Sequence, residues 1–165
     1  MYEHRAVGGE AVGCAILTVS DTRTPETDTS GERIRALLTE AGHAIVHYAI
    51  VHDEPAQIRG HLDMLLDNPA VRVVVVNGGT GLAPRDVTYD TIAGMLEKRL
   101  DGFGELFRML SFQEIGAAAM LSRATAGVVR GKFLASLPGS TAAVELAMTR
   151  LLVPELRHVA RLLSG

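Results

Sequence analysis

The sequence predicts a doubly wound α/β fold, in which helices cover both faces of a largely parallel sheet. Three β-rich segments alternate with helical patterns in the first 100 residues, and this order is typical of such folds. The third segment, residues 71–77, is rich in valine on both faces, which indicates a strand buried on both sides. A glycine cluster, residues 78–81, follows directly. This pairing predicts a ligand-binding loop at the carboxyl end of a buried strand.

Composition indicates one ordinary globular domain. The chain has 165 residues, of which 47% are hydrophobic and 21% charged, and we predict a single domain over residues 1–165 with a flexible tail at 1–11. The net charge is −3 and like charges form no long run, so nucleic acid is not an expected partner. No apolar run has the length of a membrane span, and the N-terminus lacks a signal-peptide pattern, so no membrane contact is expected.

The single cysteine, Cys14, lies in an apolar strand pattern and is interpreted as a buried core residue. It excludes an internal disulfide and a cysteine-rich metal site. Together with the absence of a signal peptide, it predicts a cytoplasmic location. The mean hydropathy of +0.20 favours an oligomer, because it suggests more apolar surface than a monomer needs.

The first strand is predicted at residues 14–19, and a polar loop follows at 20–30. Thr29 and Glu32 have the spacing of a capping box, which predicts that a helix begins there. Gly42 is expected to end that helix as the residue after its C-cap.

A second strand is predicted at 43–51, and Pro55 is expected in the first turn of the next helix. That helix ends before the Asn68–Pro69 pair. After the valine-rich strand and its glycine loop, an apolar pattern over 87–100 predicts a further helix.

The second half of the chain is less regular. Two short helical pieces, 105–112 and 114–121, are predicted after a break at 101–104. Residues 126–137 have the pattern of a hairpin whose second strand joins the sheet. The last helix is expected to be interrupted at Pro154.

Loops that leave the carboxyl ends of the predicted strands are expected to meet at one edge of the sheet. The polar residues on these loops are Asp21, Asp53, Thr80, Asp86 and Ser140. Two carboxylates facing a loop that accepts phosphate suit magnesium-dependent phosphoryl or nucleotidyl transfer, because Mg²⁺ binds one or two carboxylates together with substrate phosphates.

Each of these residues also has a structural interpretation. The helix N-caps expected by position are Asp53, Asp86 or Thr88, and Ser140. Asp21 lies in a polar loop where aspartate is common, and Arg85 would pair with a phosphate or remain a solvated charge. The glycines themselves would suffice for a tight turn alone.

Common catalytic and nucleotide motifs are absent from the sequence. No Lys-Ser or Lys-Thr follows the glycines, and Pro84 stands where the third glycine of G-x-G-x-x-G would be, so a P-loop and a dinucleotide fold are disfavoured. The six histidines lack zinc-ligand spacing, and no G-x-S-x-G elbow occurs.

Several short motifs occur in a characteristic order along almost the whole chain. They are Val19-Ser-Asp-Thr22, Gly78-Gly-Thr-Gly81, Arg85-Asp-Val-Thr88, Gly102-Phe-Gly-Glu105, Leu121-Ser-Arg123, Ala126-Gly127 and Pro138-Gly-Ser140. This set resembles the MoaB/MogA family of molybdenum cofactor biosynthesis, which includes the gephyrin and plant G domains. Residues 102–116 and the Leu-Pro-Gly-Ser-Thr141 segment look most like the MoaB branch.

The resemblance implies a three-layer α/β/α sandwich with a central, mostly parallel sheet that assembles as trimers or hexamers. It also implies Mg²⁺-dependent adenylylation of molybdopterin by ATP, which gives adenylyl-molybdopterin and pyrophosphate. By match to the family motifs, Asp53 and Asp86 would be catalytic and would hold Mg²⁺. The residues expected to bind substrate are Ser20, Asp21, Gly78, Gly79, Thr80, Gly81, Arg85, Thr88, Ser122, Pro138, Gly139 and Ser140.

Two other functions remain open at this point. The chain would be a non-catalytic molybdopterin carrier or scaffold if it kept the pocket without turnover, or a different nucleotide hydrolase that shares the domain. A molybdenum-insertion protein acting downstream is a further expected partner. The retained Asp53 and Asp86 favour the adenylyltransferase.

Overall fold

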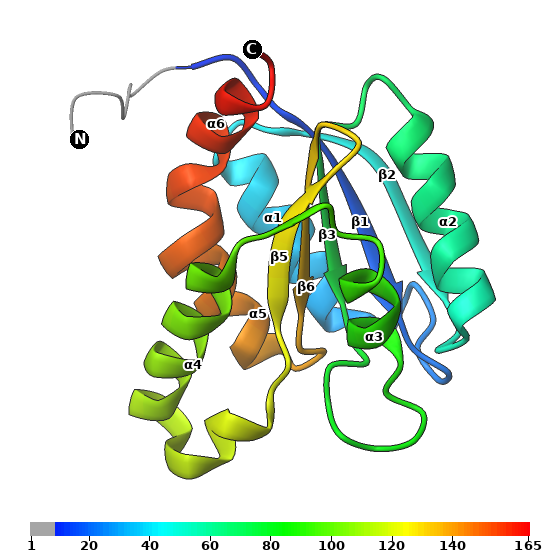
Figure 1. The fold of residues 1–165 in the computed structure, drawn as a ribbon, viewed down its shortest axis with the longest axis vertical. Helices are drawn as coiled ribbons and strands as arrows, with labels where there is room; N and C mark the ends of the chain where they lie inside the picture. The colour runs from blue at the N-terminus through cyan, green and yellow to red at the C-terminus, as the bar shows by residue number, and fades with distance from the viewer. Residues whose placement is uncertain (1–8) are drawn as a thin grey trace.

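A mixed sheet of six strands in the order β2-β1-β3-β6-β5-β4 runs through the centre of the computed structural model, which describes residues 9–165 (Figure 1). Positions 1–8 of the predicted tail lie outside the described residues. The strands are β1 (Gly13–Val19), β2 (Ala44–Val51), β3 (Val73–Asn77), β4 (Lys98–Arg99), β5 (Thr125–Val129) and β6 (Lys132–Leu137). The helices are α1 (Thr29–Glu40), α2 (Pro55–Asp67), α3 (Thr88–Ala93), α4 (Asp101–Ile115), the 3-10 helix η1 (Gly116–Leu121), α5 (Thr141–Ala147), the π-helical turn η2 (Met148–Leu152) and α6 (Val153–Leu162).

Four neighbouring strands of the sheet pair in parallel, and the other two join through antiparallel pairings. β1 pairs in parallel with β2 and β3, and β3 pairs in parallel with β6. The short β5 and β4 then extend the edge in antiparallel pairing. All five residues of β3 are buried, as its run of valines predicts.

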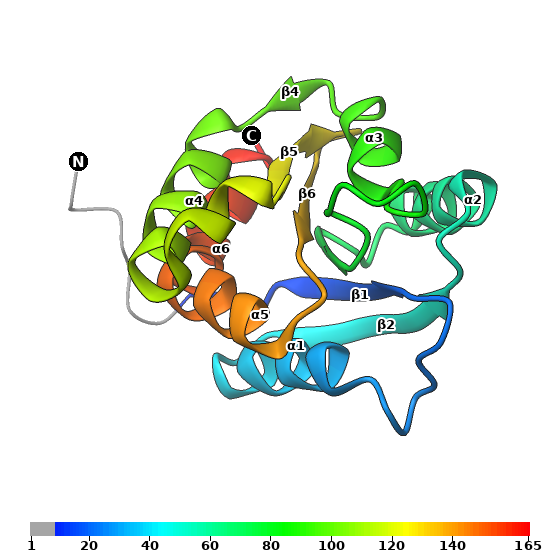
Figure 2. The ribbon, with the colours of Figure 1, turned by 90° about the horizontal axis from the view of Figure 1, so that it is seen from below.

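Helices cover both faces of the sheet, so the predicted three-layer α/β/α sandwich is confirmed (Figure 2). One core contains Ile16, Val75 and Ala135 of the sheet together with α1, α4, α5 and α6. The second core contains Leu17, Val76 and Leu134, and α2 and α3 cover it. No helix within residues 9–165 combines the length and apolar character needed to cross a membrane.

The start of α1 differs from the capping-box prediction by one residue. Asp28 is the N-cap, and its carboxylate accepts a hydrogen bond of 3.0 Å from the Gly31 N–H. Thr29 is instead the first helical residue, and its hydroxyl contacts that of Thr141 at 3.1 Å. Aspartate suits this position better than threonine, because its negative charge also interacts favourably with the positive end of the helix dipole. At the other end Gly42 follows the C-cap with φ +85°, as predicted.

The break predicted at 101–104 is wrong, because α4 runs without interruption from Asp101 to Ile115. Phe103 and Phe107 lie one turn apart with ring centroids 6.3 Å from each other, and both are buried. This burial outweighs the low helix propensity of two glycines. The second predicted piece is correct in place, although its residues 116–121 form a 3-10 helix.

Two other boundaries also differ from the predictions. The helix predicted over 87–100 ends at Ala93, and Lys98–Arg99 form the edge strand β4, which is too short and too polar to show a strand pattern. Pro154 does not interrupt the last helix, because it occupies the first turn of α6 after the π-helical turn η2.

We predict that Cys14 does not react with iodoacetamide in the folded protein. Its side chain is fully buried in the first core, and this burial raises the pKa of the thiol to about 12. Since the thiolate is the reactive form, modification should require unfolding. Mass spectrometry after labelling at pH 8 would check this, with the urea-unfolded chain as the positive control. Rapid labelling of the native protein would contradict it.

Candidate functional site

The loops that follow β1, β3 and β6 meet at one edge of the sheet, as the sequence predicts. Gly78 donates its N–H to the Leu137 carbonyl at the end of β6. A Cβ on Gly78 would lie 2.2 Å from the Val19 carbonyl oxygen at the end of β1, and its φ is +108°. Gly139 packs on the opposite side, with its virtual Cβ 3.3 Å from the Gly78 Cα. Only glycine fits at position 78, because any side chain would overlap the backbone of β1.

The remaining glycines bring the loop against two carboxylates. A Cβ on Gly79 would lie 2.0 Å from the Thr88 hydroxyl oxygen and 3.1 Å from an oxygen of Asp53. A Cβ on Gly81 would lie 2.7 Å from an oxygen of Asp86. Asp53 and Asp86 therefore flank the glycine loop, which extends from residue 78 to residue 86.

Asp53 does not cap α2, so this structural interpretation is wrong. The N-cap of α2 is Glu54, whose side chain makes no capping hydrogen bond. The Asp53 carboxylate instead accepts long hydrogen bonds of 3.4 Å from the Val87 N–H and the Thr88 hydroxyl. The chain after β2 thus delivers a buried carboxylate to the loop after β3, at the start of α3.

Asp86 and Thr88 do not cap α3 either. The N-cap is Val87, and Thr88 is the first residue of the helix. The Asp86 carboxylate accepts a hydrogen bond of 2.9 Å from the Ala83 N–H within its own loop. Ser140 does cap α5 as predicted, since its hydroxyl accepts from the Ala143 N–H.

Asp53 and Asp86 form a negatively charged pair without a basic partner among the described residues. Burial raises the pKa of Asp53, and the charges of Asp86 and Asp21 raise it further against the hydrogen bond from Val87. Arg85 does not relieve this repulsion, because its guanidinium bonds to Asp21 at 2.9 Å and to Glu54 at 2.8 Å. The pKa of Asp21 is lowered by that contact with Arg85.

The repulsion around Asp53 leads to a stability prediction. Because the pKa of Asp53 is higher in the folded chain than its ordinary value of 3.8, the ionised carboxylate lowers the stability at any pH above the folded pKa. We expect Asp53→Asn to be more stable than wild type at pH 7 by about 1 kcal/mol, as is common when a functional site is neutralised. Below pH 3.8 the gain should vanish. Urea titrations at pH 7 and pH 3.5 check this, and a destabilised variant at pH 7 would contradict it.

Arg123 fixes the glycine loop from outside, a role that sequence reasoning missed. Its guanidinium donates to the carbonyl of Gly81 at 2.8 Å and to that of Asp86 at 2.9 Å. It also pairs with both carboxylate oxygens of Asp90 at 3.1 Å, and it lies over the Tyr89 ring at 4.9 Å. The residue was part of the Leu121-Ser-Arg123 motif, but only the contacts reveal that it holds both ends of the segment 81–86.

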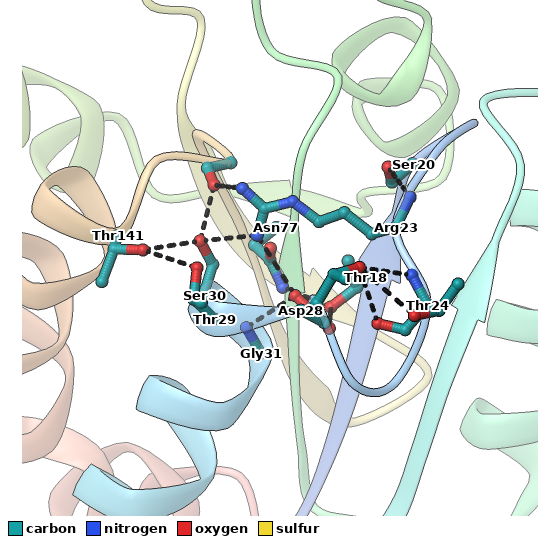
Figure 3. A network of polar contacts seen from close by, with 12 residues as sticks. Thr18, Ser20, Arg23, Thr24, Asp28, Thr29, Ser30, Gly31, Asn77 and Thr141 are labelled. Carbon is teal, nitrogen blue, oxygen red and sulfur yellow. Dashed lines mark hydrogen bonds and ion pairs between the residues drawn. The ribbon is translucent and has the colours of Figure 1, made fainter.

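A buried polar network fixes the Pro138-Gly139-Ser140 turn, and it was also missed (Figure 3). The Asp28 carboxylate accepts hydrogen bonds from the hydroxyls of Thr18 and Tyr48, both at 2.6 Å, and Arg23 pairs with it at 3.3 Å. Arg23 and Ser30 both donate to the Gly139 carbonyl, at 3.2 and 2.6 Å. Burial acts to raise the pKa of Asp28, but the hydrogen bonds that its carboxylate accepts from Thr18, Tyr48, the Gly31 N–H and Arg23 outweigh burial and lower the pKa.

The other predicted residues take different positions. The Ser20 hydroxyl accepts from the Arg23 N–H at 3.0 Å and shapes its loop. Thr80 is buried, and its carbonyl accepts from the Arg123 N–H. Ser122 lines a separate cavity, which Arg123 also lines. The contacts therefore bring together Asp21, Asp53, Asp86, Thr88 and the glycine loop, whereas Ser122 lines the separate cavity.

No group of three or more histidine, cysteine, aspartate or glutamate side chains within residues 9–165 has the geometry of a metal site. Two carboxylates beside a loop for phosphate are instead the donor set that Mg²⁺ uses when substrate oxygens and water complete its shell. Asp53 and Asp86 fit this requirement, because both are acidic, adjacent and without a basic partner in the described chain.

Comparisons with known proteins agree with this architecture. A family model described as "Probable molybdopterin binding domain" matches residues 15–158, which is most of the chain. The chain belongs to this family. The resemblance to the MoaB/MogA family noted from the motifs is thereby confirmed.

Curated relatives and solved structures fit the same family. "Molybdenum cofactor biosynthesis protein B" of Halalkalibacterium halodurans is 52% identical over 96% of this chain and 94% of its own length. The protein of the same name from Bacillus subtilis is 49% identical over 98% of this chain and 95% of its own. A crystal structure of a protein with that name superposes with a TM-score of 0.92 at 47% identity, over 94% and 97% of the two chains. The tungsten cofactor synthesizing protein MoaB from Pyrococcus furiosus gives 0.85 at 32% identity, over 96% and 100%.

Proposed function

We propose that this chain acts in molybdenum cofactor biosynthesis as a molybdopterin adenylyltransferase that uses ATP and Mg²⁺. Family membership supports the pathway and the binding of molybdopterin. The observation that supports the chemistry is the Asp53–Asp86 pair, two adjacent carboxylates without a basic partner in the described chain, which flank a glycine loop.

In the proposed reaction the terminal phosphate of molybdopterin attacks the α-phosphorus of ATP. A bond forms between the attacking oxygen and that phosphorus, the bond to the β-phosphate oxygen breaks, and pyrophosphate leaves. The attacking phosphate is already an anion at neutral pH, so a general base is not required. Mg²⁺ held by Asp53 and Asp86 would neutralise the phosphate charges on which this transfer depends.

The chain's own residues would bind and orient the two substrates. The glycine loop would offer the backbone N–H groups of Gly79, Thr80 and Gly81 to substrate phosphate. The turn at 138–140 packs against this loop, because a Cβ on Gly139 would lie 3.3 Å from the Gly78 Cα. Arg85 is already paired with Asp21 and Glu54, so binding a phosphate through Arg85 would require it to release one of them.

We further propose that the chain works in the cytoplasm as a homo-oligomer and passes its product to a molybdenum-insertion protein. Exposed apolar side chains on one stretch of α4 support self-association, and they are Leu106, Met109, Phe112 and Ile115. Each lies three residues from the next, so successive members of this group are neighbours on the helix surface. Light scattering should give the mass of a trimer or hexamer, and Phe112→Glu should reduce it to that of a monomer.

Turnover separates this proposal from the carrier or scaffold. Purified protein is incubated with molybdopterin, ATP and Mg²⁺, and both pyrophosphate and bound molybdopterin are measured. We expect pyrophosphate to form in proportion to the molybdopterin consumed. Tight binding of molybdopterin without pyrophosphate would favour the carrier, and pyrophosphate or phosphate release without molybdopterin would favour a nucleotide hydrolase.

A further inference from the structure

A cavity of about 640 Å³ lies at the end of the sheet where β1 and β3 begin. Its lining contains residues 9–13, which lead into β1, the turn before β3, and the last turns of α6. In Figure 1 the end of α6 lies at the top, whereas the green loop that follows β3 lies at the bottom. The cavity is therefore remote from the proposed reaction site, and its volume lies within the range of small-molecule sites.

Three arginines line this cavity, and they are Arg72, Arg157 and Arg161. The acidic side chain in the lining is Glu10, so positive charge exceeds negative charge there, in a chain whose net charge is −3. Within residues 9–165 none of the three guanidiniums forms an ion pair with a carboxylate. A concave site with an excess of one charge attracts ligands of the opposite charge.

Backbone carbonyls hold two of these side chains in place without neutralising them. Arg72 donates to the Ala160 carbonyl at 2.8 Å. Arg157 donates to the carbonyls of Gly9 at 3.2 Å and Ala41 at 2.8 Å. The Nη1 atoms of both guanidiniums make no hydrogen bond within residues 9–165. Because a carbonyl carries no net charge, both arginines are oriented and keep their charge and a donor for a ligand.

Arg161 is exposed in the last turn of α6, and its side chain makes no hydrogen bond or ion pair within the described chain. It lies four residues after Arg157 on the same helix, so the two side chains are neighbours on the helix surface. Like charges at this spacing destabilise a helix. An anion shared by the two guanidiniums would remove this repulsion.

The charges of these arginines act on other titratable groups nearby. Burial lowers the pKa of His43, and the charge of Arg157 lowers it further. Partial burial also lowers the pKa of Lys132, and the charge of Arg72 adds to this effect while Asp67 opposes it. Both cationic groups therefore experience the positive charge at this end of the sheet, which a bound anion would neutralise.

A phosphate group fits these donors better than a carboxylate does. A guanidinium donates two parallel hydrogen bonds to either group. A phosphate monoester, however, offers three acceptor oxygens and a charge of about −1.5 to −2 at pH 7, so that several guanidiniums can share it. The cavity is larger than one phosphate needs, and its three arginines come from two separate segments of the chain. This arrangement favours a ligand with more than one phosphate.

We propose that this cavity binds a small ligand with two or more linked phosphate groups, through Arg72, Arg157 and Arg161. The bound ligand would join residues 9–13 to the end of α6, since both line the cavity. It would take no part in the transfer reaction, because Arg72 precedes β3 and the glycine loop follows it. This second site goes beyond the proposed function and does not depend on it.

Calorimetric titration with tripolyphosphate tests the site, and EDTA is present so that no Mg²⁺ can link the probe to Asp53 and Asp86. Wild type is compared with Arg161→Gln and with the control Arg59→Gln. Arg161 lines the cavity and bonds to nothing in the described chain, so its substitution should leave the fold intact. Arg59 is exposed on α2, outside the cavity. Each variant loses one positive charge, so the pair distinguishes a specific site from general attraction.

We expect wild type to bind tripolyphosphate with a Kd of about 0.1 mM or below. Arg161→Gln should weaken binding about fivefold or more, because a charged hydrogen bond at a partly exposed site is lost. Arg59→Gln should bind within about twofold of wild type, because a distant exposed charge is screened by salt. Citrate, a tricarboxylate, should bind wild type about tenfold or more weakly than tripolyphosphate, because its groups carry less charge and fewer oxygens.

Hydrogen exchange and thermal unfolding locate the bound anion. Tripolyphosphate at about ten times its Kd should slow amide exchange in residues 9–13 and at the end of α6, but not in residues 78–81. It should also raise Tm by about 3 °C or more. Arg157→Gln provides a second variant. Even if the loss of its two carbonyl contacts lowers the Tm of the free protein, tripolyphosphate should raise that Tm by no more than about half as much as in wild type.

The phosphate site is rejected if wild type binds no tripolyphosphate up to about 5 mM. It is also rejected if Arg161→Gln and Arg59→Gln weaken binding equally, if citrate binds as tightly, or if the exchange protection falls on residues 78–81. These outcomes leave the proposed function untouched, because the titration contains no Mg²⁺, ATP or molybdopterin. Absence of adenylylation in the turnover assay would in turn reject the proposed function alone.

Discussion

Asp86→Asn is expected to abolish adenylylation while the protein stays folded. The substitution removes the charge of the carboxylate that lies beside Gly81 but keeps an oxygen able to accept from the Ala83 N–H. Removing one electrostatic contact with the charge that develops in a transition state costs about a hundredfold or more in kcat. Pyrophosphate release under saturating substrates measures this loss.

The control for this prediction is Asp67→Asn. Asp67 is an exposed residue that ends α2 and pairs with Arg130, remote from the glycine loop. It should keep kcat within about twofold, because an exposed ion pair contributes at most about 1 kcal/mol and touches no substrate. A higher Mg²⁺ concentration should not restore the full kcat of Asp86→Asn, because the carboxylate would orient the phosphates as well as hold the metal. Full activity of Asp86→Asn would remove the residue from the proposed chemistry.

Gly78→Ala is expected to cause the largest loss of stability of any single methyl addition in the site. The residue has φ +108°, and the new Cβ would lie 2.2 Å from the Val19 carbonyl oxygen, which belongs to the backbone of β1. Left-handed backbone costs an alanine about 1–2 kcal/mol, and the overlap with a carbonyl adds to this. We expect a loss of about 3 kcal/mol or more, which lowers Tm by roughly 6 °C or more in a chain of this size.

Gly60→Ala is the matched control for this strain. Gly60 is exposed within α2, and no heavy atom lies within 4 Å of its virtual Cβ. Alanine there should stabilise the protein by roughly 0.5–1 kcal/mol, because it reduces the entropy of the unfolded chain and favours the helix. Thermal unfolding of both variants checks the pair. Equal Tm values for Gly78→Ala and wild type would show that the loop adapts.

The layers of the fold were predictable because buried faces of helices and strands require apolar residues at regular spacings in the sequence. The valines of β3, the apolar stripes of α1 and α2 and the position of Gly42 all follow from local rules that the structure confirms. The break at 101–104 was wrong because local propensity could not foresee the burial of Phe103 and Phe107. The two-residue strand β4 depends on pairing with β5, which a local pattern does not contain.

The candidate site was predictable in part for the same reason. Strand ends place Asp53, Asp86 and the glycines at one edge, and topology alone brings them together. Residues that act across the fold left no local signal. Arg123 bonds to carbonyls about 40 positions away, and Arg23 bonds to the Gly139 carbonyl. The role of Asp53 could not be predicted from its position before α2, because its carboxylate contacts Thr88 at the start of α3 instead.

The central claim is that the adenylyl group of ATP is transferred to molybdopterin at the carboxylate-flanked glycine loop. The most direct measurement follows the label from α-³²P-ATP and, in parallel, from γ-³²P-ATP, in the presence of Mg²⁺ and molybdopterin. The account predicts that the α label appears in a molybdopterin product, that the γ label appears only in pyrophosphate, and that Asp86→Asn gives neither. Transfer of the γ label to molybdopterin, or bound molybdopterin that never acquires the α label, would contradict it.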